Sequence, residues 1–479
     1  MFPLLTTSDT LFALVLEVLF VIIWVGTIFV VITENRNPVK TLAWVMVLVF
    51  LPVIGFVLYV FFGMDMRQEK VIGKRSLSKL LKEALLNYKD YAVPAPPSPY
   101  EKLVRMMRHA NQSYLLPANK VTTFTDFPSM LHDLLCTIAS AKQHIHVQFY
   151  IFMDDAVGRL LRDALIDKAR QGIKVRLLYD DVGSWRVRNR FFRAMKEAGI
   201  EVYPFGEVKF AALAKRANYR NHRKVVVIDG KVGYIGGMNV AERYYKGVAW
   251  GHWRDTHIRI DGMAANALQT SFFVDWYYAS RVLVSDGNCF PKVLQQGTTD
   301  MQIVTSYPMG EWKTIMQGML QVICQSRHYL YIQTPYFLPT EPILTALRNA
   351  ALAGVDVRLM VPRHGDSLLA DLASHSYYKE VMTAGVKIYQ YEAGYLHAKV
   401  MLADDNFVTV GSTNFDFRSF EHNFEINAFI YDPVVVKDMK RIFMADLKCS
   451  SRIIAEEWRK RPLWNRFWES LVRLLSPLL

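Results

Sequence analysis

The chain has 479 residues, too many for one ordinary domain, and its 57 lysines and arginines against 44 acidic residues give a formal net charge of +13. Because 52% of the residues are apolar and 21% are charged, the composition excludes disordered and collagen-like proteins and indicates membrane contact. The positive charge predicts an anionic partner, with nucleic acid, anionic lipid and a phosphate-bearing substrate all open. The four cysteines lie far apart without metal-ligand spacing, which favours neither a disulfide framework nor a zinc site.

Two apolar runs begin the chain. The first, residues 11–33, is interrupted only by Glu17 and would reach about 35 Å as a helix, enough to span a bilayer. The second, residues 41–63, is equally long and contains Pro52 and Gly55, which membrane helices often tolerate. The short connector permits only a hairpin, so we predict a two-helix transmembrane hairpin over residues 1–66. A cleaved signal peptide is less favoured, because a basic start and a small-residue cleavage site are missing.

Basic residues near the apolar runs predict the orientation of the hairpin. None precedes the first run, the connector contains Arg36 and Lys40, and six follow the second run between residues 67 and 82. By the positive-inside rule, the large remaining part of the chain should face the cytoplasm. We interpret residues 67–100 as a basic segment followed by a stiff, proline-rich linker, in which the charges face either solvent or anionic lipid headgroups.

Beyond residue 100 the chain repeats itself. The strand patterns at 145–150 and 330–336 are each followed by a helical segment that ends at a glycine, Gly172 or Gly354, and then by a buried strand. A third pair of segments, beginning at residues 198 and 384, keeps nearly the same offset. This repetition predicts an α/β fold with two tandem domains of one type, residues 101–290 and 291–479.

Each repeat contains the pattern HxKx4Dx6G followed by an asparagine. The first copy comprises His222, Lys224, Asp229 and Asn239, and the second comprises His397, Lys399, Asp404 and Asn414. If a strand begins at each histidine, the histidine and lysine share one face while the residue between them points back into the protein. Each repeat then offers a nucleophile or acid beside a positive charge. We expect the glycines to let the chain turn and the asparagine amides to donate to a substrate phosphate oxygen.

The duplicated pattern resembles the paired HKD motif of the phospholipase D superfamily, whose members bring two repeats together around one active site. The chemistry fits: displacement at a phosphodiester requires a nucleophile, an acid for the leaving alkoxide and positive charge on the phosphate oxygens. No metal-binding carboxylate cluster is evident in the sequence, so we expect no metal and no cofactor. The resemblance implies that His222 attacks to form a phosphohistidine and that His397 is the acid and base, although near-symmetric repeats leave the reverse order open.

Four carboxylates accompany these histidines. Asp255 lies 33 residues after His222 and Glu425 lies 28 residues after His397, distances at which the superfamily places the carboxylates that orient its histidines. Such a partner selects the tautomer of an imidazole. Asp229 and Asp404 complete the two motifs, but five residues beyond the lysine we expect them to cap structure rather than to react.

The resemblance extends over nearly the whole chain to the bacterial cardiolipin synthases, carried by segments such as Leu51-Pro52-Val53-Ile54-Gly55, Thr334-Pro335-Tyr336-Phe337 and Gly411-Ser412-Thr413-Asn414. It implies reversible phosphatidyl transfer between two phosphatidylglycerol molecules, giving cardiolipin and glycerol. It also implies a multi-pass protein of the bacterial cytoplasmic membrane, with anionic lipids and no nucleic acid as partners; a homo-oligomer stays open. The alternatives are a phospholipase D-type hydrolase and a CDP-diacylglycerol-dependent phosphatidyltransferase.

The end of the chain has helical spacing of large apolar residues. From Trp464 to Leu475, tryptophan, phenylalanine and leucine fall on one face, opposite Arg466, Glu469 and Arg473. Such an amphipathic helix either lies in a membrane interface or packs its apolar face on the catalytic core, and the sequence favours neither.

Overall fold

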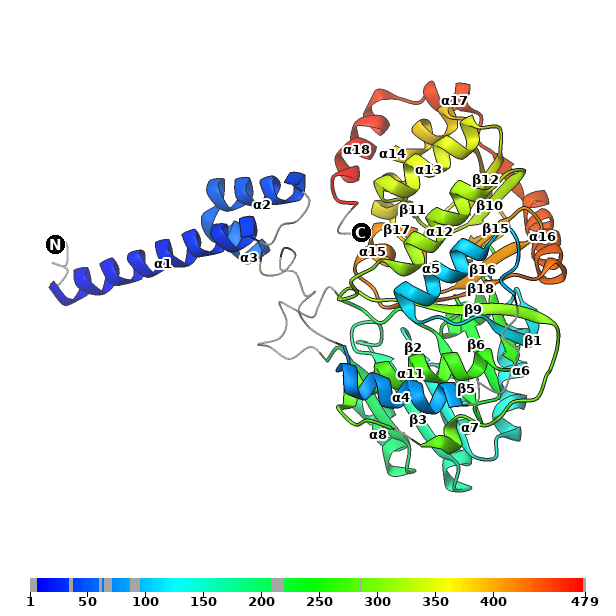
Figure 1. Ribbon diagram of the computed structural model, residues 1–479. Coiled ribbons are helices and arrows are strands. Elements are labelled where there is room, and N and C mark those ends of the chain that lie inside the picture. Colours follow the sequence, from blue (N-terminus) through cyan, green and yellow to red (C-terminus); the bar gives the residue numbers. More distant parts are fainter. Residues whose placement is uncertain are drawn as a thin grey trace. The chain divides into compact units, whose positions relative to one another are not determined.

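The computed structural model describes residues 7–33, 38–59, 63, 71–86, 95–207, 219–284 and 286–476 (Figure 1). The chain forms two units: residues 1–68 with 208–218, and residues 69–207 with 219–479. Of the predicted segment 67–100, the structure describes residues 71–73, the helix α4 (Lys74–Leu86) and residues 95–100.

The small unit contains one long apolar helix, α1 (Thr7–Thr33). Residues Phe12–Thr33 are apolar enough and long enough to cross a membrane. The indole N–H of Trp24 donates to the carbonyl of Leu48 at 2.6 Å, which joins α1 to α2 (Pro38–Phe50). The first predicted span is therefore present as a helix.

The second apolar run differs from the prediction of one continuous span. It forms α2 and then α3 (Pro52–Leu58), 13 and 7 residues long, separated at Leu51. Pro52 has no N–H to donate and its ring clashes with the preceding helical turn, so the helix restarts there with proline in its first turn. Neither helix alone reaches the length of a bilayer core. Residues 60–62 lie outside the described part of the chain.

The large unit is built on one sheet of 15 strands with an internal repeat. The order β4-β3-β2-β5-β6-β8-β1 of the first half recurs as β13-β12-β10-β15-β16-β18-β9 in the second, and the halves join through the antiparallel pair β1–β9. The first half comprises β1 (Leu116–Phe124), β2 (His144–Phe149), β3 (Lys174–Asp180), β4 (Glu201–Phe205), β5 (Val225–Ile228), β6 (Val232–Gly236) and β8 (His257–Asp261). The second comprises β9 (Thr299–Ser306), β10 (Tyr329–Gln333), β12 (Asp356–Pro362), β13 (Lys387–Tyr391), β15 (Val400–Ala403), β16 (Phe407–Gly411) and β18 (Glu425–Ile430).

Five short strands complete the topology. One of them extends the second half at its edge, and the others form two parallel pairs: β19 (Ser450–Arg452), β7 (His252–Arg254) with β14 (Gly394–Leu396), and β11 (Phe337–Leu338) with β17 (Phe415–Asp416). The pair β7–β14 matters for the site, because it joins a segment of the first half to the segment directly before His397.

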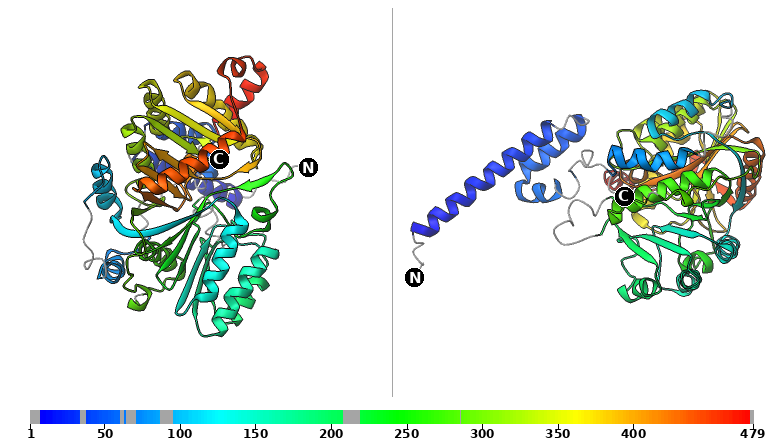
Figure 2. Two further views of the ribbon diagram at one scale, coloured as in Figure 1. Left: turned by 90° about the vertical axis from the view of Figure 1, so that its right-hand side faces the viewer. Right: turned by 60° about the horizontal axis from the view of Figure 1, so that its bottom comes forward.

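Helices cover both faces of the sheet (Figure 2). Alternate side chains of β5 show why: Val225 and Val227 pack towards one face, while Val226 and Ile228 pack towards the other. One face carries α6 (Phe127–Ser140), α7 (Ala156–Arg170), α8 (Asn189–Glu197), α12 (Thr314–Gln325), α13 (Glu341–Leu352) and α14 (Leu368–Thr383). The opposite face carries α11 (Ala264–Ser280) and α16 (Pro433–Lys448).

The predicted repeat is confirmed by these matching halves. Gly172 and Gly354 have φ of +86° and +92° directly after α7 and α13, a backbone conformation that glycine adopts without a steric penalty. The helix α5 (Glu101–Asn111) nevertheless packs in the core of the second half, with Leu103 and Met107 among its buried residues. The exact division of the chain at residues 290 and 291 stays a prediction.

Candidate active site

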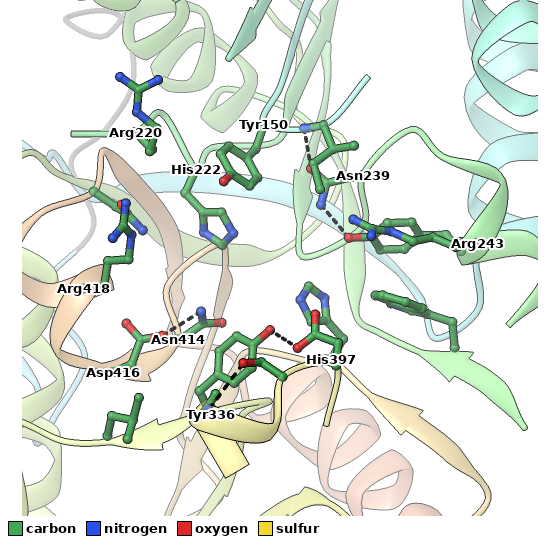
Figure 3. Close-up of a pocket in the computed structure, with 18 residues that line it drawn as sticks. Tyr150, Arg220, His222, Asn239, Arg243, Tyr336, His397, Asn414, Asp416 and Arg418 are labelled. Carbon is green, nitrogen blue, oxygen red and sulfur yellow. Dashed lines mark hydrogen bonds between the residues drawn. The ribbon is translucent and has the colours of Figure 1, made fainter. Parts of the chain in front are cut away.

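Both motif histidines line one pocket of about 360 Å³ in the large unit, together with both predicted asparagines (Figure 3). The imidazoles of His222 and His397 enter it from the two halves of the sheet. The pocket is partly open to solvent and is also lined by Tyr150, Arg220, Arg243, Tyr336, Asp366 and Arg418.

The motif histidines precede their strands rather than begin them. β5 and β15 start at Val225 and Val400, three residues later than the predicted strands. The backbone N–H of His222 donates to the carbonyl of Phe424 at 3.0 Å, and that of His397 donates to the carbonyl of Arg254 at 2.7 Å. The backbone N–H of each histidine is therefore bonded to the opposite half of the sheet. This bond replaces the pairing that the histidine would make as a residue of its own strand.

The orienting carboxylates also come from the opposite halves. The Nδ1 atom of His222 lies 3.0 Å from Oε1 of Glu425, and Nδ1 of His397 lies 2.7 Å from Oδ2 of Asp255. Both carboxylates are completely buried. A carboxylate on Nδ1 selects the tautomer with a proton there, so Nε2 is the nitrogen of each ring that remains for chemistry.

The residues one position after the motif glycines, Ser412 and Gly237, lie against these carboxylates. The hydroxyl of Ser412 donates to Oε2 of Glu425, whose Oε1 also accepts from the side-chain amide of Asn423 at 3.2 Å. At the equivalent position of the first repeat, a Cβ on Gly237 would lie 2.1 Å from Oδ1 of Asp255. Glycine is thus required at this position by the close approach of a carboxylate.

The motif lysines lie behind the histidines and do not line the pocket. The ammonium groups of Lys224 and Lys399 donate to the backbone carbonyls of His222 and His397, respectively. Both side chains are buried, which lowers the pKa of Lys224 well below its usual range and that of Lys399 to about 8. Their charge acts on the site from beneath the imidazoles.

The motif aspartates bind backbone at the opposite ends of β5 and β15 from the motif histidines. The carboxylate of Asp229 accepts the backbone N–H groups of residues 142, 143 and 144 at 2.8–2.9 Å. Asp404 accepts those of residues 327, 328 and 329 at 2.6–2.9 Å. Each aspartate therefore fixes the chain that enters β2 or β10, the neighbour of its own strand β5 or β15 in the sheet.

The two pocket asparagines are anchored by protein groups. The amide of Asn239 donates to the hydroxyl of Tyr244 at 2.5 Å, and its Oδ1 accepts from the backbone of Ile151. The amide of Asn414 donates to Asp416 at 2.9 Å. Each NH₂ group has a second hydrogen, so this anchoring leaves one donor on each asparagine.

Two pocket arginines escaped the sequence analysis, although a repeat signal marks them. Arg243 and Arg418 each follow the asparagine of their repeat by four residues. Arg418 lies on the side of His222 and Arg243 on the side of His397 (Figure 3). Arg243 stacks over the ring of Trp253, which itself contacts His397. Arg243 and Arg418 thus add positive charge to the lining of the pocket, whereas the third pocket arginine, Arg220, is buried and paired with Asp180.

Burial of histidines makes the stability of the protein sensitive to acid. Burial lowers the pKa of His397 to about 4 and that of His257 to about 3, against about 6.5 in an unfolded chain. Between these values the unfolded chain binds more protons, so this contribution to stability is complete above about pH 6.5 and is lost as the pH falls towards 4. We expect the midpoint of thermal unfolding to drop by roughly 5–10 °C from pH 7.5 to 4.5. An unfolding midpoint that stays constant over this pH range would contradict the role of the buried histidines. So would a pH dependence of the midpoint that is the same in His257→Asn as in the wild type.

Comparison with known proteins assigns the chain to a family. The family model described as "Cardiolipin synthase, PLD-like domain" matches residues 134–266 and 319–447, and "Phospholipase_D-nuclease N-terminal" matches residues 22–63. The chain is 41% identical over 478 residues to the major cardiolipin synthase ClsA of Bacillus subtilis, covering 98% of this chain and 99% of that protein. The chain belongs to the cardiolipin synthases of the phospholipase D superfamily. The family resemblance expected from the sequence is thus confirmed.

Further relatives support the same assignment. A cardiolipin synthase of Geobacillus kaustophilus is 38% identical, with 94% of this chain and 91% of that protein covered. Among solved structures, phosphatidylserine synthase of Haemophilus influenzae superposes with a TM-score of 0.61 over 79% of this chain and all of that chain, at 14% identity. That structure shares the fold of this chain. The apolar α1 and these relatives indicate that the protein associates with a membrane.

Proposed function

We propose that this cardiolipin synthase transfers a phosphatidyl group from one phosphatidylglycerol molecule to another through a phosphohistidine on His222. The observation that carries the proposal is the pair of imidazoles in one pocket, each with Nδ1 held by a buried carboxylate. Two such rings supply a nucleophile and a proton donor without any other reactive group.

In the first step, Nε2 of His222 attacks the phosphorus of the first lipid. A nitrogen–phosphorus bond forms, the bond from phosphorus to the headgroup glycerol oxygen breaks, and the proton on Nε2 of His397 moves to that oxygen. Although burial and the neighbouring Lys399 lower the pKa of His397 in the free protein, the negative charge of a bound phosphodiester raises it. Binding therefore provides the protonated form that the step needs.

In the second step, neutral His397 removes the proton from the terminal glycerol hydroxyl of the second lipid. The oxygen attacks phosphorus, the nitrogen–phosphorus bond breaks, and cardiolipin leaves with His222 restored. One phosphodiester replaces another, so the reaction is nearly balanced and reversible. Asn239 and Asn414, with the charge of the two motif lysines, stabilise the phosphate oxygens in both steps.

The identity of the products tests this function. Phosphatidylglycerol vesicles without any nucleotide are expected to yield cardiolipin and one glycerol per cardiolipin, measured by mass spectrometry and a glycerol assay. Phosphatidic acid as the sole lipid product would make the protein a hydrolase, because water would then accept the phosphatidyl group. Product formation only after addition of CDP-diacylglycerol would assign it to the nucleotide-dependent phosphatidyltransferases.

The proposal extends to the membrane. The basic residues after the second apolar run support an orientation with the catalytic unit in the cytoplasm. A multi-pass arrangement in the bacterial cytoplasmic membrane would require α2 and α3 to cross it together. Cys136 is exposed on that unit, so a membrane-impermeant thiol reagent should label it in inverted vesicles and not in intact cells. A homo-oligomer is compatible with this arrangement, and cross-linking in the membrane tests it.

A further inference from the structure

The last helix of the chain, α18 (Leu463–Arg473), is docked on the catalytic unit with its polar face inwards. Its buried residues are Glu469, 4% exposed, and Val472, 6% exposed. Both oxygens of Glu469 accept from the guanidinium of Arg461, at 2.6 and 2.9 Å. Arg473 pairs with Glu380 of α14 at 3.2 Å and stacks over the ring of Tyr377. Ion pairs and one valine thus hold the helix in place.

The apolar face of α18 points away from the protein. Its large apolar side chains are between 41% and 77% exposed and continue into the turn after the helix: Leu463, Trp464, Phe467, Trp468, Leu471, Leu474 and Leu475. The rings of Trp464, Phe467 and Trp468 contact one another on this surface. We call these seven residues the α18 face. A helix in water would bury this face and expose its charges, so the observed docking predicts that something apolar covers the face.

The surroundings of the α18 face favour a lipid surface as that cover. Tryptophan and phenylalanine are typical of the membrane interface, where the ring is apolar and the indole N–H stays hydrated. Lys460 and Arg466 are exposed next to the α18 face in the sequence, and such basic residues are attracted to anionic headgroups. Two exposed glutamates, Glu456 and Glu457, lie on the preceding helix α17 (Ala455–Arg459) and not on α18.

The α18 face is also connected to the mouth of the pocket. α18 packs along α14 in the upper half of the unit (Figure 1), and Ser367, the N-cap of α14, lines the pocket. About 12 Å of helix separates this N-cap from His375, which lies against Glu469 of α18. In the first turn of α14, Leu368 is 75% exposed and Leu369 is also exposed. Apolar surface is therefore present both on α18 and beside the opening through which a lipid must enter.

We propose that the α18 face inserts into the headgroup region of the bilayer and holds the mouth of the pocket at the lipid surface. The choice of a lipid occupant rests on the proposed function, because the substrates of that function are bilayer lipids. The helix acts by insertion and takes no part in the chemistry, so its contribution is confined to substrates that reside in a bilayer.

Direct contact is tested by fluorescence quenching. The full-length protein is reconstituted in vesicles whose phosphatidylglycerol carries bromine near the headgroup, and the quenched share of tryptophan emission is compared among variants. Trp464→Phe/Trp468→Phe should remove a measurable part of the quenchable emission. Trp458→Phe, which removes a tryptophan packed against Arg461 and Tyr378, should not. Equal quenching in the double variant and the wild type would overturn the proposal. Because this readout needs no turnover, it remains decisive even if the protein makes no cardiolipin.

Activity supplies the second test. Phe467→Ser/Leu471→Ser/Leu474→Ser should lower cardiolipin formation from bilayer vesicles at least tenfold while leaving activity on short-chain phosphatidylglycerol in detergent within twofold. The control Leu294→Ser/Leu352→Ser/Val434→Ser removes three apolar residues elsewhere on the unit that are on average more exposed and should change neither activity. Equal losses on both substrates, no loss on either, or a change of oligomeric state in the α18 variant alone would overturn a lipid occupant; the last result would assign the face to a second copy of the chain.

Discussion

The His222→Ala variant is expected to lose cardiolipin formation by at least about 10⁴-fold, because it removes the imidazole that forms the proposed phosphohistidine. The His397→Ala variant should lose a similar factor with phosphatidylglycerol, since a glycerol alkoxide leaves poorly without a proton. The two losses have different causes, and a substrate with a better leaving group separates them.

A radiolabelled phosphatidyl ester of p-nitrophenol provides that separation. Its phenolate leaves unprotonated, so His397→Ala should still accumulate an acid-labile, base-stable label on the protein, whereas His222→Ala should accumulate none. The control His109→Ala changes an exposed histidine on α5, outside the pocket, and should behave as the wild type does. Label on His222→Ala but not on His397→Ala would reverse the roles of the two histidines, and label on neither would exclude a phosphohistidine.

Glu425→Gln is expected to lower kcat roughly 10³–10⁴-fold with little change in thermal stability. The variant keeps the shape of the side chain, but its amide can present a donor to Nδ1 of His222 and so favour the tautomer with the proton on Nε2, which cannot attack phosphorus. Asp255→Asn should act in the same way on His397. Single-turnover rates with phosphatidylglycerol in detergent measure both effects.

Asp404→Asn is the matched control for these carboxylates, since it lies in the motif but touches neither imidazole. Its amide nitrogen would face the backbone N–H of Arg327, which now donates to Oδ2, at a cost of about 1–3 kcal/mol in stability. We expect a lower unfolding midpoint and a nearly unchanged kcat of the folded protein. If Asp404→Asn instead slows the folded enzyme as much as Glu425→Gln does, orientation of the imidazoles does not explain the carboxylates.

Much of the molecule can be read from the sequence because duplication and local chemistry leave marks on it. The repeat at a constant offset predicts two equivalent halves, and the matching strand orders on the two sides of β1 and β9 confirm them. The apolar run ending at Thr33 predicts α1 by length and composition alone. The motif residues are recognisable for the same reason, since each repeat preserves their spacing.

The pairing of each carboxylate with a histidine of the opposite half could not be predicted from the sequence. Asp255 lies nearer to His222 in the chain but contacts His397, and Glu425 contacts His222 across 203 residues of sequence. Spacing records only the distance along the chain, whereas these pairs depend on how two half-sheets meet at β1–β9 and on the cross-connections β7–β14 and His222–Phe424. The close approach of Asp255 to Gly237, which requires glycine there, depends instead on the pairing of β6 with β8 within the first half.

The sequence by itself determined the family, the repeat and the first apolar helix, because each depends on which residue types recur at which spacing. Only the tertiary structure decided which carboxylate serves which histidine, that the motif lysines lie behind the imidazoles, and that α18 turns its apolar face outwards. The physical reason is that burial and pairing are properties of surfaces brought together by folding. The amphipathic pattern of α18 is equally compatible with either face inwards, until Arg461, Glu380 and Tyr377 meet its polar side.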